Sequence, residues 1–260
     1  MFRRFAVVVN ASKAGALPFA KMLKTQLEKD GIDVRIFAEY PLDENVLCKF
    51  DLIVTVGGDG TILGIAGTAA KFEIPVFAVN HGEIGFLSTA DQEHALNRIE
   101  NLKENNFKLS SRSMLSVSLN GTQYPALNDV VIRSKNCVRL IKLAAHFNGN
   151  LVSEYRADGL IVSSPTGSTA YNFSAGGPIV YPAFDCLILT PICQHDRHTR
   201  SLVLPGFGEL TIAEIGDEFA IYCDGNLVNH GNEITITISE KKLHLIEAEL
   251  SFFDILRRKL

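Results

Sequence analysis

A turn of three glycines around one carboxylate is the feature of this sequence with the clearest chemical potential. Gly57-Gly58-Asp59-Gly60-Thr61 follows the apolar run Leu52–Val56 and precedes Thr61–Phe72, whose spacing predicts a helix. Glycine lets backbone N–H groups come close to an anion, and the start of a helix favours negative charge. The pattern therefore predicts a phosphate-binding turn formed by Gly57, Gly58, Gly60 and Thr61.

Asp59 does not suit a turn that only holds phosphate, because its carboxylate would repel the charge of the ligand. We interpret it as a general base that acts on a substrate hydroxyl, or as a carboxylate linked to a metal ion. A structural role, in which Asp59 or Thr61 caps the helix, is the alternative. The turn lacks the Gly-Lys-Ser/Thr of a Walker A loop and the GxGxxG of the common dinucleotide fold.

Three further segments carry polar residues in patterns that suit a ligand. Asn80–Leu87 follows a second predicted strand, and its Asn80 and Phe86 are candidates for a binding loop, although a structural turn is an equal alternative. Asn128 and Asp129 stand within an apolar run, where the residues alone favour a turn or bulge. The run Tyr155–Pro178 is dense in hydroxyl groups and contains Tyr171, which can stack on a base, although such a run is often only a loop.

The elements that must position these residues fall into two patterns. The first hundred residues alternate short apolar runs with helical spacing, which predicts an α/β domain with a parallel sheet over 1–105, Rossmann-like or phosphofructokinase-like. A capping-box pattern, Thr89-Ala90-Asp91-Gln92, predicts the start of its last helix. From Phe107, period-two strands with turn signals predict a β-rich, sandwich-like domain over 106–248. The segment 249–260 regains helical spacing and is expected to pack back on the first domain.

Composition excludes several classes of function. The chain has 260 residues, of which 47% are hydrophobic and 21% charged, and this balance is typical of a compact globular protein. A net charge of -4 without a basic face argues against nucleic acid, and no apolar run is long enough for a membrane helix. Five cysteines without a CxxC pair favour reduced thiols and a cytoplasmic location. No metal ligand set is identified, because His195 and His198 lack an accompanying carboxylate pattern.

Taken in order, these segments resemble the NAD kinase family. The Gly57–Thr61 turn alone resembles a wider group of kinases that includes lipid kinases and phosphofructokinases, whereas Asn80–Leu87, Asn128-Asp129, Tyr155–Pro178 and Asp224-Gly225-Asn226 are similar to NAD kinases in particular. The resemblance implies Mg²⁺-dependent phosphoryl transfer to the adenosine 2′-hydroxyl of NAD, which gives NADP. The implied donor is ATP, with inorganic polyphosphate as the alternative, and the implied assembly is a homodimer or homotetramer.

The same resemblance implies roles for individual residues. Asp59 would be catalytic, and the NAD-binding residues would be Asp59, Gly60, Asn128, Asp129, Arg139, Arg156, Asp158, Thr169, Ala170, Tyr171, Asn172, Phe173, Ser174 and Asn226. This chain departs from the family pattern at three of the matched positions, where Asp129 replaces Glu, Ala157 replaces Gly and Asn226 replaces Gln.

Two other functions are compatible with parts of this pattern. A lipid kinase would need a hydrophobic acceptor pocket, and the Thr166–Pro178 run and the Asn128-Asp129 pair favour a dinucleotide instead. A non-catalytic protein that binds NAD or NADP would have no need of Asp59 within its full motif. A turnover assay distinguishes an enzyme from such a regulator.

Overall fold

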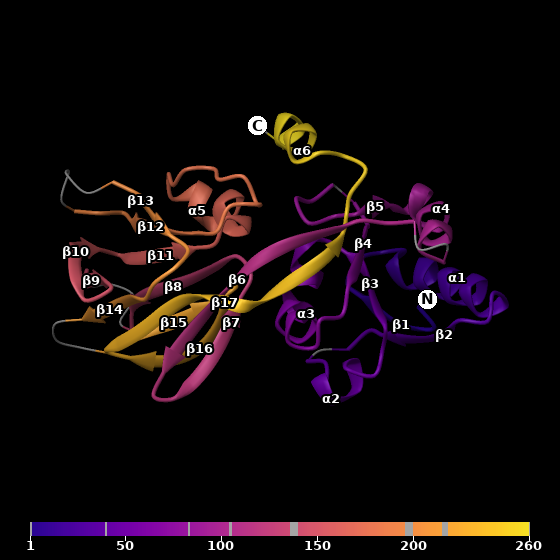
Figure 1. Cartoon of the computed structure of the whole chain (residues 1–260), viewed down its shortest axis with the longest axis horizontal. Helices are drawn as coiled ribbons and strands as arrows, with labels where there is room; N and C mark the ends of the chain where they lie inside the picture. Colours follow the sequence, from indigo (N-terminus) through magenta and orange to yellow (C-terminus); the bar gives the residue numbers. More distant parts are fainter. Residues whose placement is uncertain are drawn as a thin grey trace. The chain divides into compact units, whose positions relative to one another are not determined.

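The computed structural model describes residues 2–39, 41–82, 84–103, 106–135, 140–195, 200–214 and 218–259. The chain forms two compact units (Figure 1): unit 1 consists of residues 1–111 and 242–260, and unit 2 consists of residues 112–241. Among the described residues, no helix is both long enough and apolar enough to cross a bilayer.

Unit 1 is built on a parallel sheet with the strand order β2-β1-β3-β4. Two short pairings extend it, because β5 runs parallel to β4 and Leu245, near the end of β17, pairs with Val76. The strands and helices are β1 (Arg4–Val9), α1 (Ala16–Lys29), β2 (Asp33–Phe37), α2 (Glu44–Leu47), β3 (Leu52–Gly57), α3 (Asp59–Lys71), β4 (Val76–Asn80), β5 (Ala90–Asp91), α4 (Gln92–Lys103) and α6 (Phe252–Lys259).

The central strand of unit 1 explains why this sheet forms. Every residue of β3 is buried, as the continuous apolar run predicts for a strand covered on both faces. The side chains of α1, including Leu23 and Leu27, pack with those of β1 and β3 in one core. The predicted α/β domain is confirmed, and the carboxyl ends of β1, β3 and β4 lie together at one edge of the sheet.

The predicted capping box before α4 is wrong. Thr89 is buried, its hydroxyl donates to the backbone oxygen of Ile246 (3.0 Å), and it accepts from the N–H of Ala78 (3.1 Å). Asp91 accepts instead from the N–H of His94 (2.9 Å), the third residue of α4. Tertiary contacts with β17 and β4 thus use the Thr89 hydroxyl, and Asp91 takes the capping position.

Unit 2 consists of two sheets that share a core. One has the order β10-β9-β14-β17, with β6 next to β17 and β7 next to β6; the other has the order β13-β12-β11-β8-β15-β16. The elements are β6 (Leu109–Leu119), β7 (Thr122–Ala126), β8 (Asp129–Ser134), β9 (Ile141–Phe147), β10 (Asn150–Ala157), β11 (Gly159–Ser163), η1 (Thr166–Thr169), α5 (Tyr171–Ser174), β12 (Cys186–Ile192), β13 (Leu202–Pro205), β14 (Leu210–Glu214), β15 (Phe219–Cys223), β16 (Asn226–Gly231) and β17 (Glu233–Ile246).

This core forms because successive side chains of each strand point to opposite faces of its sheet. Val130 and Ile132 of β8 face the same cluster as Leu210 and Ile212 of β14, although the two strands belong to different sheets. The predicted sandwich-like, β-rich architecture is confirmed. Three hairpins turn at Asn120-Gly121, Asn148-Gly149 and Asp224-Gly225, where both central residues have positive φ, as the turn signals predict.

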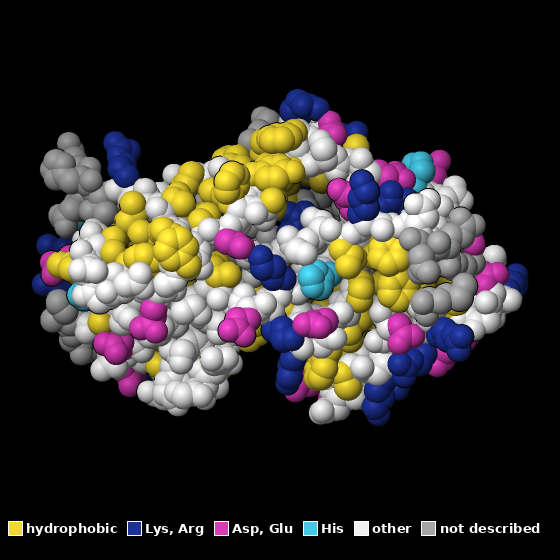
Figure 2. All heavy atoms as spheres, in the orientation of Figure 1, with side chains coloured by type: hydrophobic (Ala, Val, Ile, Leu, Met, Phe, Trp, Pro, Cys, Tyr) yellow, Lys and Arg dark blue, Asp and Glu magenta, His cyan; other side chains and the backbone are white. Residues whose placement is uncertain are grey.

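The outer face of the six-stranded sheet is also partly covered. Val131, Ile161 and Ile192 form a second cluster there, and Ala175, just after α5, packs against it. Hydrophobic side chains remain visible over α5 and over α6 (Figure 2), where Phe173 is 43% exposed and Phe253 is 54% exposed.

Candidate functional site

The glycine turn lies between the end of β3 and the start of α3. Gly57 is the last residue of β3, Gly58 is the N-cap, and Asp59 is the first residue of the helix. A side chain at Gly57 would collide with the Thr61 hydroxyl and lie 3.2 Å from Asn10 Cβ, so the close approach requires glycine. The turn therefore places backbone N–H groups and a carboxylate together at the N-terminus of a 13-residue helix.

The Asp59 side chain does not cap its own helix. It accepts hydrogen bonds from the N–H of Phe86 (3.0 Å to Oδ2) and the N–H of Leu87 (3.4 Å to Oδ1). A Cβ at Gly85 would lie 2.6 Å from Oδ2 and would overlap the rest of the carboxylate. The loop after β4 therefore binds the Asp59 carboxylate and leaves space for it at Gly85. The alternative in which Asp59 caps α3 is wrong.

The environment of Asp59 makes its carboxylate more basic. Burial raises the pKa of Asp59, while the two N–H donors of Leu87 and Phe86 and the charges of Lys259 and Lys13 oppose the rise. A carboxylate with a raised pKa accepts a proton more readily than an ordinary aspartate, as a general base must. The structure thus gives Asp59 both a fixed orientation and an increased affinity for protons.

The last helix of unit 1 contacts the same loop. The rings of Phe252 and Phe86 have centroids 5.8 Å apart, and Lys259 Nζ lies 5.6 Å from the centroid of the Phe86 ring. Because Phe86 donates its N–H to Asp59, α6 supports the loop that holds the carboxylate. Phe86, a candidate ligand residue, therefore also has a structural role.

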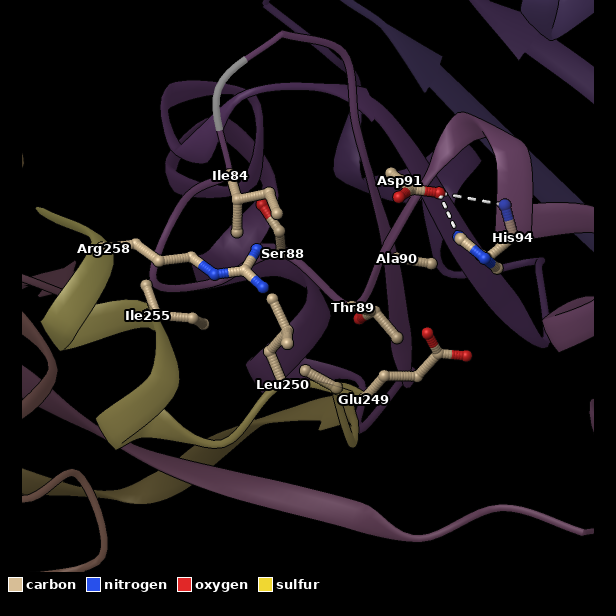
Figure 3. A pocket seen from close by; sticks show the side chains of 11 residues that line it. Ile84, Ser88, Thr89, Ala90, Asp91, His94, Glu249, Leu250, Ile255 and Arg258 are labelled. Carbon is tan, nitrogen blue, oxygen red and sulfur yellow. Dashed lines mark hydrogen bonds and ion pairs between the residues drawn. The ribbon is translucent and has the colours of Figure 1, made fainter.

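A pocket of about 200 Å³ adjoins this loop (Figure 3). It is lined by Ile84, Ser88, Thr89, Ala90, Asp91, His94, Ala248, Glu249, Leu250, Ile255 and Arg258. In Figure 3 Arg258 extends from α6 toward Ser88, whose hydroxyl accepts from the N–H of Gly85 (3.1 Å). Asp91 Oδ1 lies 2.8 Å from His94 Nδ1, and this contact raises the pKa of His94. Asp59 does not line the pocket, so the pocket is separate from the glycine turn.

A second group of predicted residues converges in unit 2. Asn128 lies in a bend before β8, and Asp129 is the first residue of that strand. The backbone oxygen of Asn128 accepts from the N–H of Ser164 (2.9 Å), and the Asp224 carboxylate accepts from the N–H groups of Leu127 (2.7 Å), Asn128 (2.7 Å) and Asp129 (3.2 Å). Asp224 therefore organises the Asn128-Asp129 segment.

Two carboxylates come close together in this group. Burial raises the pKa of Asp129 to about 7, and the charge of Asp224 contributes to the rise. Burial also raises the pKa of Asp224, but its three N–H donors oppose this and stabilise its ionised form. Asp224 is thus the charged partner, and Asp129 is partly protonated at neutral pH. A protonated Asp129 can donate a hydrogen bond as well as accept one.

The hydroxyl-rich run forms η1 and α5 over the outer face of the six-stranded sheet. Asn172 is completely buried: its Nδ2 donates to the backbone oxygens of Ser168 and Pro178 (both 3.0 Å), and its Oδ1 accepts from the Thr190 hydroxyl (2.6 Å). Its side chain therefore stabilises the loop, while Tyr171, Phe173 and Ser174 are exposed.

Tyr171 marks the other end of this face. Arg133, at the far end of β8, donates a hydrogen bond to the Tyr171 hydroxyl, and its guanidinium lies 5.7 Å from the centroid of the ring. Asp129 and Arg133 are four residues apart on one strand, a rise of about 13 Å with both side chains on the same face. The spacing suits an extended ligand.

The remaining predicted residues are placed as follows. Arg156, in β10, and Asp158, between β10 and β11, are exposed. Gly159, at the start of β11, pairs with Arg133. Asn226 is exposed and donates to the backbone oxygen of Asp224 (3.4 Å). Thr169 and Ala170 are half-buried. Arg139 and His198 lie outside the described residues.

Sequence reasoning missed two residues that the structure brings to these groups, Lys13 and Arg133. It named Asp224 as part of the Asp224-Gly225-Asn226 motif but did not predict its contact with the Asn128-Asp129 segment. The contact of Asp224 joins it to residues 95 to 97 positions earlier in the chain, and no local pattern indicates it. Arg133 and Lys13 stand outside every motif, and no local pattern in the sequence indicates their contacts.

Comparison with known proteins identifies the family to which this chain belongs. Residues 7–107 match the model of the ATP-NAD kinase N-terminal domain, and residues 127–248 match that of the ATP-NAD kinase C-terminal domain. The chain is 34% identical over 239 residues to an NAD kinase of Clostridium beijerinckii, with 88% of this chain and 84% of the relative covered. It is 38% identical over 228 residues to an NAD kinase of Clostridium botulinum, with 84% and 81% covered. The chain belongs to the NAD kinase family.

Solved structures agree with this assignment. An NAD kinase of Archaeoglobus fulgidus, determined in complex with ATP, has a TM-score of 0.83 and 29% identity, and the match covers 98% of each chain. A yeast NADH kinase, determined with NADH, has a TM-score of 0.87 over 99% of this chain and 87% of that chain; at 24% identity it supports the fold alone. Family membership excludes the lipid kinase alternative, because both domain models are those of NAD kinases.

Proposed function

We propose that this chain transfers a phosphoryl group from ATP to the adenosine 2′-hydroxyl of NAD and so produces NADP. The observation that carries the proposal is the Asp59 carboxylate, which is fixed by two backbone N–H groups beside a helix N-terminus. A protein that only bound NAD would have no use for a half-buried carboxylate with a raised pKa at a phosphate-binding turn.

In this mechanism Asp59 orients the 2′-hydroxyl and takes its proton. The hydroxyl oxygen forms a bond to the γ-phosphorus, the bond from that phosphorus to the β–γ bridging oxygen breaks, and ADP leaves. Each oxygen of the carboxylate accepts one backbone N–H and keeps a lone pair for the substrate hydroxyl. Gly57, Gly58 and Gly60 let the backbone approach the donor phosphates, and the N-terminus of α3 offsets their charge.

The residues at the turn fit a magnesium ion that is held mainly by the donor. Within the described part of the chain, no group of three or more His, Cys, Asp or Glu side chains forms a metal site, and Asp59 is the carboxylate at the turn. Mg²⁺ in phosphoryl-transfer enzymes commonly takes one or two carboxylates, with substrate phosphates and water as its other ligands. Asp59 would contact such an ion, which when bound neutralises charge on the phosphates.

We assign NAD binding mainly to the residues of unit 2 that the resemblance implies, and Asp59 and Gly60 of the glycine turn are the others that it names. The distance between Asp129 and Arg133 along β8 supports the assignment, because it gives polar groups at both ends of an apolar face. Asp129, with its pKa of about 7, is suited to pair with ribose hydroxyls in either protonation state. The proposed domain roles follow: 1–105 carries the phosphate turn, 106–248 binds NAD, and 249–260 supports the first domain.

The proposal extends to setting and assembly. We place the protein in the cytoplasm, where it supplies NADP, because the described cysteines 48, 186, 193 and 223 are free thiols. We also propose self-association as a homodimer or homotetramer, and inorganic polyphosphate as the alternative donor, from the resemblance to the family.

A coupled assay of NADP formation with NAD, ATP and Mg²⁺ tests the proposal. The control variant is Asp59→Asn, which keeps the size of the side chain but removes its charge and its capacity as a base. We expect kcat to fall by about a thousandfold or more, while the Kd for NAD stays within about threefold of wild type. A kcat near the wild-type value in this variant would show that Asp59 is not the base. NAD binding without NADP formation by the wild type, with ATP or polyphosphate, would instead support a regulatory protein.

A further inference from the structure

Lys13 lies beside the glycine turn, in the loop that joins β1 to α1. Its Nζ donates to the backbone oxygen of His81 (2.8 Å). A Cβ added at Gly58 would lie 3.1 Å from this nitrogen, and one added at Gly82 would lie 3.6 Å from it. The ammonium therefore lies close to the backbone of two glycines, one of which is the N-cap of α3.

The charge of Lys13 is available to a ligand. Among the residues that the structure describes, His81 provides its one hydrogen-bond acceptor, and no carboxylate forms an ion pair with it. An ammonium has three N–H donors, so two remain for an incoming group. Asp59 is affected by this charge, because Lys13 is one of the two cations that lower its pKa against the effect of burial.

The loop around Lys13 is fixed before any ligand arrives. The N–H of His81 donates to the backbone oxygen of Gly57 (2.8 Å), and His81 Nε2 lies 2.6 Å from the backbone oxygen of Ala14. His81 thus joins the Lys13 loop to the end of β3. A cation held in place in advance stabilises a phosphate without reorganising, which increases its contribution to binding and catalysis.

Two buried oxygens near the turn have no hydrogen-bond partner in the described structure. They are Thr61 Oγ1 and Asn80 Oδ1, in side chains that are 5% and 3% exposed. Asn80 pairs in register with Gly57, and a Cβ added at Gly57 would collide with Thr61 Oγ1 in the first turn of α3, so both oxygens lie near the carboxyl-terminal end of β3. Buried polar atoms usually have partners, and a bound polar ligand with its water would supply them here.

From this geometry we infer that Lys13, close to Gly58 and near enough to affect the Asp59 carboxylate, binds the terminal phosphates of the phosphoryl donor. The inference rests on the proposed function and adds a donor-binding residue to it. The Lys13 ammonium pairs with the charge of the γ-phosphate in the ground state and with the charge that develops on the leaving phosphate during transfer. Its positive charge also reduces the electrostatic repulsion between the Asp59 carboxylate and the donor phosphates.

Steady-state kinetics of Lys13→Met and Lys13→Arg test this inference, with Lys21→Met as the control on the exposed side of α1. We expect Lys13→Met to lower kcat/KM for ATP by about 30-fold or more while KM for NAD stays within about twofold, and we expect Lys13→Arg to recover part of the loss. A purely structural role through His81 would lower the thermal unfolding temperature and change both KM values together. That result, or a kcat/KM for ATP within about threefold of wild type, would overturn the inference.

Calorimetric titration with inorganic tripolyphosphate separates the inference from the proposed function. We expect the wild type and Lys21→Met to bind tripolyphosphate in the presence of Mg²⁺, and Lys13→Met to bind it at least about tenfold more weakly. If binding depends on Lys13 but the wild type forms no NADP, the proposed function fails and the phosphate site stands. If the wild type forms NADP and all three proteins bind tripolyphosphate equally, the inference about Lys13 fails and the proposed function stands.

Discussion

Gly85 leaves the space that the Asp59 carboxylate occupies, and Gly85→Ala tests how much the reaction depends on that fit. The added Cβ would lie 2.6 Å from Oδ2 and closer still to Oδ1 and Cγ, whereas real Cβ atoms essentially never come within 3.0 Å of a heavy atom outside their own residue and its chain neighbours. The backbone at Gly85 has no left-handed φ, so alanine is compatible with its conformation. The effect of the substitution therefore acts through the carboxylate.

The size of the effect follows from the contacts that Asp59 must give up. To clear the methyl group the carboxylate has to move by roughly 1 Å, and a displacement of that size lowers turnover by about a hundredfold. The move also breaks the hydrogen bonds from Phe86 and Leu87, which are 3.0 and 3.4 Å long. A hydrogen bond to a charged group contributes about 1.5–3 kcal/mol, and the 3.4 Å bond is the weaker of the two, so we expect the free energy of unfolding to fall by about 3 kcal/mol.

A double-mutant cycle with Asp59→Ala distinguishes this explanation from general damage to the loop. In the Asp59→Ala background there is no carboxylate to displace, so the added methyl should leave the thermal unfolding temperature unchanged within error. The two measurements are kcat for NADP formation and the unfolding temperature of all four proteins. A Gly85→Ala variant with kcat within about threefold of wild type, or an equal loss of stability in both backgrounds, would refute the reasoning.

Two further predictions concern the carboxylates of unit 2. The pKa of Asp129 is raised to about 7, so the folded protein holds a proton that the unfolded chain releases near pH 4, and stability falls as pH rises from about 4 to 7 by up to about 4 kcal/mol. Asp129→Asn should therefore raise the unfolding temperature at pH 8 but not at pH 5, as scanning calorimetry would measure, and an equal shift at both pH values would contradict this. Asp224→Ala should leave three N–H groups without their acceptor, lower the free energy of unfolding by about 3 kcal/mol and raise KM for NAD, with Asp224→Asn intermediate in both readouts. An unchanged KM for NAD in a folded Asp224→Ala protein would remove Asp224 from the binding site.

Local patterns were sufficient to predict most of unit 1. The apolar run Leu52–Val56, the glycine turn and the helical spacing after it are properties of adjacent residues, and the structure places β3, the turn and α3 accordingly. Helix α3 begins at Asp59 rather than Thr61, because Gly58 takes the N-cap position. Strand β17 runs from Glu233 to Ile246, through a polar stretch that breaks the hydrophobic alternation, so its length could not be predicted from the local pattern.

Contacts between distant residues could not be predicted in this way. Asp59 is held by N–H groups 27 and 28 residues away, and Asp224 bonds to a segment 95 to 97 residues away. Neither contact leaves a periodic trace in the sequence, since the backbone N–H group is common to every residue except proline. The sequence motifs predicted individual residues of the candidate site. Which of these residues contact one another is determined by the fold.

Two Asn-Gly hairpin turns of unit 2 are positions where the protein can change chemically during storage. In an Asn-Gly pair the asparagine side chain can be attacked by the next backbone nitrogen, which glycine does not shield, and the product inserts an extra methylene into the main chain. Asn148 is restrained, because its Oδ1 accepts from the N–H of Glu209 (2.9 Å). Asn120 is exposed at the tip of the β6–β7 hairpin, so of these two asparagines we expect Asn120 to change first, and a lengthened backbone there would disturb the register of two paired strands.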